Sequence, residues 1–205
     1  MGSLRRTTPV SEHWGTERGT PLDRFYIESF LKRNRSDISG RVLEVLDRRY
    51  TERFGTGVSR TDILDINADN AKATLIQDLA TPVSDSLEDR FDCFLLIQTL
   101  QFIYNYRTAI ENARRLLRSG GVLLVTVPVI SKLDPNYDDC WRFTPHSFRT
   151  LLSHTGWSDW KIETPGNVLT GIAFLAGIAA EELKIKEVET IDPLYPLLIL
   201  ARVVK

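Results

Sequence analysis

The chain has few residues of the kinds that build metal centres or disulfide frameworks. Its 205 residues include two cysteines and three histidines, and neither Cys93 nor Cys140 has a cysteine or histidine partner at a ligand spacing. The sequence therefore predicts no metal site and no disulfide. Two unpaired thiols are typical of a reducing compartment, so we expect a cytoplasmic protein.

An excess of charge of either sign is also absent. Lys and Arg total 26 and Asp and Glu total 27, which gives no electrostatic reason to expect nucleic acid or an anionic membrane as a partner. The most apolar late segment, residues 168–180, is shorter than the roughly 20 residues that cross a bilayer. We expect it to be a helix buried against the sheet. An apolar face between Val168 and Leu183 leaves a homodimer open.

Short apolar runs alternate with helical patterns, which predicts a doubly wound α/β fold with a mostly parallel sheet. The length suits one domain over residues 1–205, with a polar N-terminal lead (1–19), a lid helix (20–36) and an α/β core (37–205). Strands are expected at 42–46, 58–66, 72–76, 91–97 and 122–127, with a last, antiparallel strand at 197–204. The second of these strands is expected to end near Asp62 or Asp65. Further helices are expected at 106–118, 145–155 and 168–180.

The most informative missing feature is a glycine-rich turn after the first strand. This strand carries Glu44 and leads to Asp47, a place where nucleotide-binding folds usually have glycines because backbone amides must approach a ligand closely. Leu46, Arg48 and Tyr50 occupy the turn instead. A pyrophosphate needs a glycine-lined helix N-terminus, so the sequence disfavours a dinucleotide-dependent enzyme.

Polar side chains follow four predicted strands in succession. They are Glu44 and Asp47, then Asp62 and Asp65, then Asp78, and finally Gln98 and Thr99. Because ligands of open α/β sheets bind outside the carboxyl ends of the strands, we expect a site there. Carboxylates suit a ligand rich in hydroxyls and amines or carrying a sulfonium. The alternative is that each acid is an ordinary solvated loop residue.

At these positions the chain resembles the class I S-adenosylmethionine-dependent methyltransferases, especially small bacterial members associated with glycan or secondary-metabolite pathways. The matching segments are Val42-Leu43-Glu44, Thr61-Asp62, Gln77-Asp78-Leu79, Phe91-Asp92-Cys93-Phe94-Leu95-Leu96 with Gln98-Thr99-Leu100, Leu116-Leu117-Arg118-Ser119-Gly120-Gly121-Val122-Leu123, and Trp141-Arg142-Phe143-Thr144-Pro145. The resemblance implies a Rossmann-like fold and S-adenosylmethionine as cofactor. The family's three glycines fall on Leu46, Arg48 and Tyr50, and the short connections suggest reduced helices between the first three strands.

The resemblance also implies roles for single residues. Glu44 would hold the methionine end of the cofactor with Asp47 nearby, Asp62 the ribose, Asp78 with Leu79 the adenine, and Gln98 and Thr99 would flank the sulfonium. A methyl transfer needs an aligned acceptor, and a general base helps when the acceptor is a hydroxyl.

For catalysis the sequence offers His146 and Asp139, with Asp138 beside it. The alternative for His146 is a helix N-terminal residue without a catalytic role. Substrate contacts are expected from Arg24 and Tyr26 of the lid helix and from Trp141 and Arg142 of the later loop. The alternative for the aromatic residues is that they fill packing space.

The expected function is therefore S-adenosylmethionine-dependent O- or N-methylation of a small-molecule acceptor, with a sugar or glycosylated metabolite as the favoured class. The rival expectation is a non-catalytic relative that serves as a partner subunit or scaffold. That rival predicts Arg48 or Tyr50 filling the cofactor site.

Overall fold

The computed structural model describes residues 5–205, so the first four residues of the predicted N-terminal lead lie outside it. Its strands are β1 (Gly40–Val45), β2 (Val58–Asp65), β3 (Leu75–Ile76), β4 (Phe91–Ile97), β5 (Leu117–Pro128), β6 (Asp159–Glu163) and β7 (Leu198–Val204). Its helices are α1 (Leu22–Arg33), α2 (Arg49–Phe54), α3 (Tyr106–Leu116), α4 (Pro145–Ser153), α5 (Val168–Ala176) and α6 (Ile185–Glu189).

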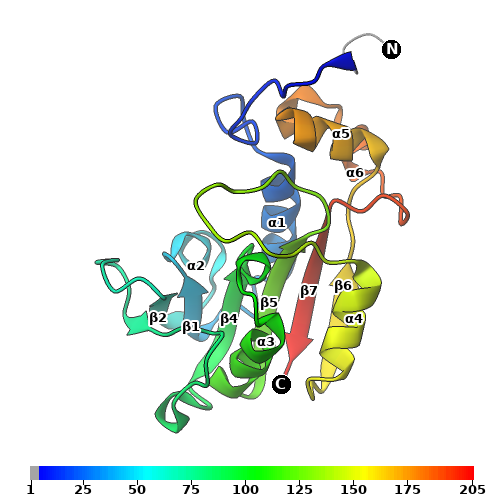
Figure 1. Cartoon of the computed structure of the whole chain (residues 1–205). Helices are drawn as coiled ribbons and strands as arrows, with labels where there is room; N and C mark the ends of the chain where they lie inside the picture. The colour runs from blue at the N-terminus through cyan, green and yellow to red at the C-terminus, as the bar shows by residue number, and fades with distance from the viewer. Residues whose placement is uncertain (1–4) are drawn as a thin grey trace.

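The seven strands form one sheet in the order β3-β2-β1-β4-β5-β7-β6 (Figure 1). Strands β1 to β5 pair in parallel, whereas β7 is antiparallel to both β5 and β6. The predicted doubly wound, mostly parallel sheet with an antiparallel last strand is confirmed. The strand order reverses direction between β1 and β4, and this reversal is where open α/β sheets place their ligands.

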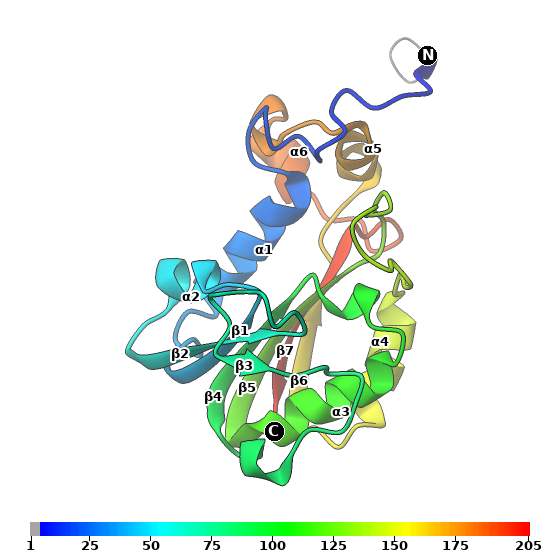
Figure 2. The same cartoon turned by 60° about the vertical axis from the view of Figure 1, so that its left-hand side comes forward.

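Side chains alternate between two hydrophobic cores, one on each face of the sheet. On β4, Phe94 and Leu96 enter the core beneath α3 and α4, and Cys93 and Leu95 enter the core beneath α1. Figure 2 shows these two layers of helices on opposite sides of the sheet. A strand covered on both faces has to be apolar throughout, which is why β4 is the most apolar run of the chain.

Three elements were missed by the sequence analysis, namely α2, α6 and β6. Helix α2 lacks a side-chain hydrogen bond at its N-cap and has no clear apolar period. Strand β6 is an edge strand of five residues whose period-two alternation of Trp160 and Ile162 with polar neighbours is its one signal. The expected reduction of the early helices is confirmed, because α2 has only six residues and residues 66–74 contain no helix.

The expectation that residues 168–180 form a helix buried against the sheet is wrong. Helix α5 spans Val168–Ala176 and packs chiefly on α1 and α6, and four of its apolar side chains are exposed: Val168, Leu169, Ile172 and Leu175. None of the helices within residues 5–205 is both long and apolar enough to cross a membrane.

The N-terminal segment lies against the end of α5, beyond the carboxyl ends of the parallel strands (Figure 1). The Val10 amide donates to the Ala176 carbonyl at 2.7 Å, and Pro21 pairs with Ala179. Gly177 ends α5 with a φ of 72°, and a Cβ there would lie 2.3 Å from the Ser11 carbonyl oxygen. A glycine is therefore required where these two segments touch.

Candidate active site

A cavity of about 1030 Å³ opens at the carboxyl ends of β1, β2 and β4. Its volume is at the upper end of the roughly 300–1,000 Å³ of small-molecule sites. Four segments supply most of its wall: residues 14–24, residues 44–50, residues 98–104 and residues 128–142. The cavity therefore lies at the predicted place, with the N-terminal segment and the loop after β5 as its outer walls.

Glu44 lies at the floor of this cavity and is 2% exposed. Its carboxylate accepts hydrogen bonds from the backbone amides of Tyr50 (2.9 Å) and Thr51 (2.8 Å) and from the Thr51 hydroxyl (2.7 Å). Burial raises the pKa of Glu44, and these three hydrogen bonds oppose that rise. Glu44 thus occupies the free amides at the start of α2, the groups that would otherwise bind an anion.

The turn after β1 has a backbone conformation that usually requires glycine, although it contains none. Leu46 has a φ of 73°, a left-handed conformation that costs a residue with a Cβ about 1–2 kcal/mol. Its amide donates to the Leu64 carbonyl at 2.9 Å, and its carbonyl accepts from the Asn70 side chain at 2.9 Å. The backbone path therefore persists although the side chain, 47% exposed, remains at the cavity wall.

Two charged residues of the same turn neutralise each other. Asp47 and Arg49 both line the cavity, and the Arg49 guanidinium donates to both carboxylate oxygens at 2.7 to 3.1 Å. These hydrogen bonds hold the pKa of Asp47 below its usual value. Arg48 points the other way and pairs with Glu52 at 2.8 Å, with both side chains 61% exposed.

The structure does not bring Asp62 to the cavity. It lies three residues before the end of β2, where Arg41 (2.7 Å), Arg60 (2.9 Å) and the Thr74 hydroxyl (3.2 Å) surround its carboxylate. Asp65, the last residue of β2, lines the cavity instead. The sequence analysis left the end of this strand at either acid. The register, with Leu43 opposite Asp62 and Val45 opposite Leu64, places it at Asp65.

The polar residues after β3 reach the cavity as expected. Asp78 and Leu79 both line it, and Asp78 accepts a hydrogen bond from the Ala80 amide at 2.7 Å. The Asn112 side chain donates to the Leu79 carbonyl at 3.0 Å and thereby fixes this turn to α3. Leu79 and the neighbouring Ile66 give this end of the cavity an apolar wall beside a carboxylate.

Gln98 and Thr99 also line the cavity, directly after β4. Gln98 has a φ of 48°, an uncommon conformation that the Thr126 hydroxyl and carbonyl hold by accepting from its amide at 3.1 and 3.0 Å. Gln101, missed by the sequence analysis, packs beneath with 5% exposure. The Gln98 Nε2 and Gln101 Oε1 atoms are buried without a hydrogen-bond partner in residues 5–205. Strain and unsatisfied polar atoms therefore coincide at this strand end.

The loop after β5 is held together by one ion pair. Arg142 donates to the Asp139 carboxylate at 2.8 Å and to the Lys132 carbonyl at 3.0 Å. The Arg142 hydrogen bond holds the pKa of Asp139 below its usual value, which weakens that carboxylate as a base. Asp138, which also lines the cavity, has no hydrogen bond to its carboxylate in the described part of the chain.

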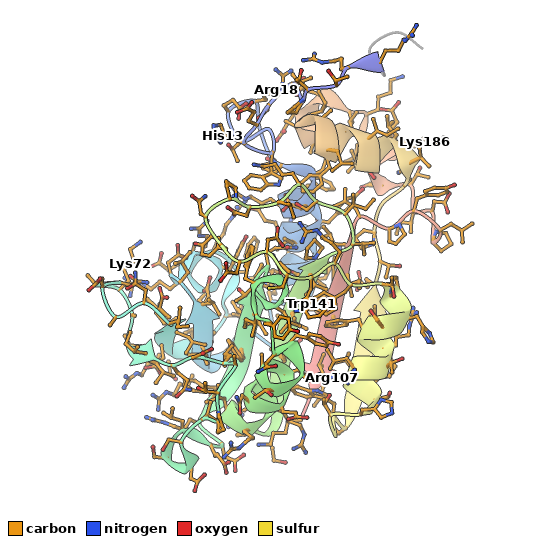
Figure 3. The ribbon with its side chains drawn as sticks, in the orientation of Figure 1. His13, Arg18, Lys72, Arg107, Trp141 and Lys186 are labelled. Atoms are coloured by element: carbon orange, nitrogen blue, oxygen red, sulfur yellow. The ribbon has the colours of Figure 1, made fainter. Side chains whose placement is uncertain are left out.

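Besides Asp62, three other predicted site residues do not line the cavity. His146 is exposed in the first turn of α4, where Thr144 and Ser147 form the capping box. Tyr26 is buried in α1 and donates to the Val188 carbonyl at 2.6 Å. Trp141 donates to the Tyr104 carbonyl at 3.2 Å and packs on Tyr106 at the start of α3 (Figure 3). The contacts of Tyr26 and Trp141 agree with the packing alternative, and the position of His146 agrees with its alternative as a helix N-terminal residue.

Comparison with protein-family models matches residues 38–125 to a family described as a methyltransferase domain. This match supports the resemblance to the class I S-adenosylmethionine-dependent methyltransferases that the sequence motifs indicate. The match contains β1 to β4, the Leu46 turn and most of β5. Among curated proteins, none matches this sequence.

Several solved structures share the fold at low identity. A methyltransferase from Archaeoglobus fulgidus is 14% identical over 88% of this chain and 94% of its own, with a TM-score of 0.56. One from Mesorhizobium loti is 14% identical over 86% and 96%, with a TM-score of 0.59. A putative methyltransferase from Haloferax volcanii, solved with the Trm112 activator, is 16% identical over 89% and 90%, with a TM-score of 0.59.

The lining of the cavity suits the adenosine part of S-adenosylmethionine, the cofactor of the methyltransferases that this chain resembles. The cavity lies at the reversal of strand order, and carboxylates and an apolar wall stand at the ends of β2 and β3. The amino-acid end is the exception, because the Leu46 turn offers no glycine and Glu44 already occupies the amides of α2. The methyltransferase therefore needs other groups to hold that end.

Proposed function

We propose that this methyltransferase modifies a hydroxyl or amine of a small molecule, with a sugar or glycosylated metabolite as the acceptor class. One observation carries the proposal: an open cavity at the reversal of strand order brings together Asp65, Asp78 and Gln98 from three successive strand ends. S-adenosylmethionine supplies a methyl group made electrophilic by its sulfonium, so the protein's task is to align an acceptor with it and exclude water.

The ribose of the cofactor is assigned to Asp65 rather than Asp62. Asp65 accepts from the Asn67 amide (2.9 Å) and the Asn70 side chain (2.6 Å), one at each oxygen, so each oxygen keeps a lone pair for a hydroxyl. Asp62 is already engaged by two arginines. The adenine is assigned to Asp78 and Leu79, and the region of the sulfonium to Gln98 and Thr99.

The acceptor is assigned to the part of the cavity below the loop after β5. Phe102 and Tyr137 form an aromatic pair there with ring centroids 4.8 Å apart, and Tyr104 is 73% exposed at the rim. Aromatic faces stack on the apolar faces of sugar rings, and carboxylates accept hydrogen bonds from sugar hydroxyls. Asp138 is the better candidate for a general base than Asp139, because Arg142 holds Asp139 in an ion pair.

The non-catalytic rival receives no support from the side chains on which it depended. Arg48 pairs with Glu52 outside the cavity, and Tyr50 lies in the cavity wall, where it stacks with Phe54 at 6.4 Å between ring centroids. A cavity of about 1030 Å³ remains beside both.

The test is calorimetric titration of the protein with S-adenosylmethionine and S-adenosylhomocysteine. We expect binding of both, weakened about tenfold or more in Asp65→Ala and Asp78→Ala because each loses a charge-assisted hydrogen bond. Asp85→Ala, an exposed acid outside the cavity, is the matched control and should bind like the wild type. Transfer of an isotope-labelled methyl group to a panel of sugars and amines then identifies the acceptor. If neither ligand binds, the proposed methyltransferase activity is refuted and a role as a partner subunit is favoured.

A further inference from the structure

The amino-acid end of the cofactor carries an ammonium and a carboxylate, and the charged side chains of the turn after β1 are already engaged by other groups. The amides of Tyr50 and Thr51 are taken by Glu44. Asp47 and Arg49 are taken by each other. A complementary pair of charges must therefore come from another wall of the cavity.

Two adjacent residues of α1 supply such a pair. Asp23 and Arg24 line the same cavity, at the first turn of α1. The Asp23 carboxylate accepts from the Arg24 backbone amide at 2.7 Å, and no Lys, Arg or His within residues 5–205 forms an ion pair with it. The Arg24 guanidinium likewise has no hydrogen bond or ion pair in the described part of the chain. Both side chains are partly buried, and neither has an ion-pair partner among residues 5–205.

The two charges lie on the first turn of α1, and α1 packs on α2, the helix that follows the turn after β1. Burial raises the pKa of Asp23, as expected for a carboxylate without a cationic partner. Burial also raises the pKa of Tyr50, and the opposed charges of Arg24 and Asp23 both act on that hydroxyl. Asp23, Arg24 and Tyr50 all line this cavity, and Tyr50 lies in α2, the helix on which α1 packs.

We propose that Asp23 and Arg24 form a zwitterion-binding pair for the amino-acid end of the cofactor, with Asp23 receiving the ammonium and Arg24 the carboxylate. The assignment rests on the proposed use of S-adenosylmethionine. It explains how the chain dispenses with the glycines at Leu46, Arg48 and Tyr50, because side chains of α1 replace backbone amides of the turn. It also gives the N-terminal helix a direct part in ligand binding, since α1 brings both groups to the cavity.

The experiment compares two ligands that differ only at this end. S-adenosylhomocysteine has the amino-acid group, and 5′-methylthioadenosine keeps the adenosine and thioether without it. Each is titrated calorimetrically into the wild type, Asp23→Asn and Arg24→Gln, with Lys32→Gln as a control, because Lys32 is an exposed cation on the same helix outside the cavity. The ratio of the two dissociation constants within one variant does not depend on how much of that variant is folded.

We expect Asp23→Asn and Arg24→Gln each to weaken S-adenosylhomocysteine about tenfold, the loss of one charge-assisted hydrogen bond, and to leave 5′-methylthioadenosine within about twofold. Lys32→Gln should change neither ligand. An unchanged ratio in both α1 variants, with the wild type still binding S-adenosylhomocysteine, overturns the zwitterion assignment and leaves the proposed function standing. Failure of the wild type to bind S-adenosylhomocysteine overturns both.

Discussion

Asp62→Ala tests whether Asp62 stabilises the fold through its ion pairs or binds the ligand. Its carboxylate is 3% exposed and lies between Arg41, whose side chain is 25% exposed, and Arg60, at 60%. Deleting one partner of a buried ion pair costs roughly 3–5 kcal/mol because the other charge is left uncompensated. Arg41 keeps some solvent contact, so we expect Asp62→Ala to lose about 2–3 kcal/mol of the free energy of unfolding.

A loss of this size is easy to measure. In a domain of this length each kcal/mol lowers Tm by roughly 2–4 °C, so Asp62→Ala should melt about 4–12 °C below the wild type. At a temperature where the variant is folded, its dissociation constant for S-adenosylhomocysteine should stay within about twofold of the wild type, since Asp62 does not line the cavity. Asp65→Ala should show the opposite pattern. The Asp65 carboxylate accepts two hydrogen bonds in an exposed turn, so we expect a loss of roughly 1 kcal/mol in the free energy of unfolding. Binding of S-adenosylhomocysteine should weaken about tenfold or more.

The pH dependence gives a second readout for Asp62. Burial alone would raise the pKa of Asp62, but the Arg41 hydrogen bond and the charges of Arg41 and Arg60 outweigh it and hold the pKa below its usual value. A carboxyl whose pKa is depressed by folding stabilises the protein above its unfolded pKa, about 3.9, and the contribution is lost as the pH falls through the folded pKa. Urea unfolding of the wild type and Asp62→Asn should therefore differ most near neutral pH and converge in acid. A variant that retains its Tm but loses S-adenosylhomocysteine would refute this reasoning and return the ribose to Asp62.

Three other substitutions or reactions test the walls of the cavity. Titration with a thiol reagent should label Cys140 alone in the native protein, because Cys93 is buried and burial raises the pKa of its thiol; S-adenosylhomocysteine should slow the labelling, and rapid reaction of two thiols would contradict the packing of β4. Gly177→Ala should push its new Cβ into the Ser11 carbonyl and detach the N-terminal segment, seen as faster tryptic cleavage before α1 than in the wild type. Leu46→Gly should relieve the left-handed strain and, after the entropy that glycine loses on folding, raise the free energy of unfolding by up to about 1 kcal/mol in chemical denaturation; a clear loss would show that the Leu46 side chain packs.

The period of the apolar residues predicted most of the fold because the buried elements carry strong patterns. Strand β4 is apolar on both faces, and α3 places its apolar residues on one face. Edge strand β6 and helix α2 depend on tertiary pairing rather than on a local pattern, so propensity could not reveal them. The exposure of the apolar side chains of α5 could not be predicted either, because an apolar run does not indicate which element covers it.

The candidate site was only partly predictable, for a reason that Asp62 and Asp65 illustrate. Both acids fit the same motif, and three residues of register decide that one meets Arg41 while the other faces the cavity. No role was predicted from the sequence for Arg41 or Arg60, although their ion pairs with Asp62 determine that this carboxylate is not free to bind a ligand.

The pairing of charges, rather than their presence, therefore defines this site. Glu44, Asp47 and Asp139 line the cavity but are satisfied by backbone amides or arginines, whereas Asp23 and Arg24 line it without partners. An unpaired charge inside a protein is costly and persists where a ligand compensates it. On this argument the missing glycines and the unpaired charges of α1 have one explanation. The amino-acid end of the ligand is bound by α1, and the turn after β1 no longer has to bind it.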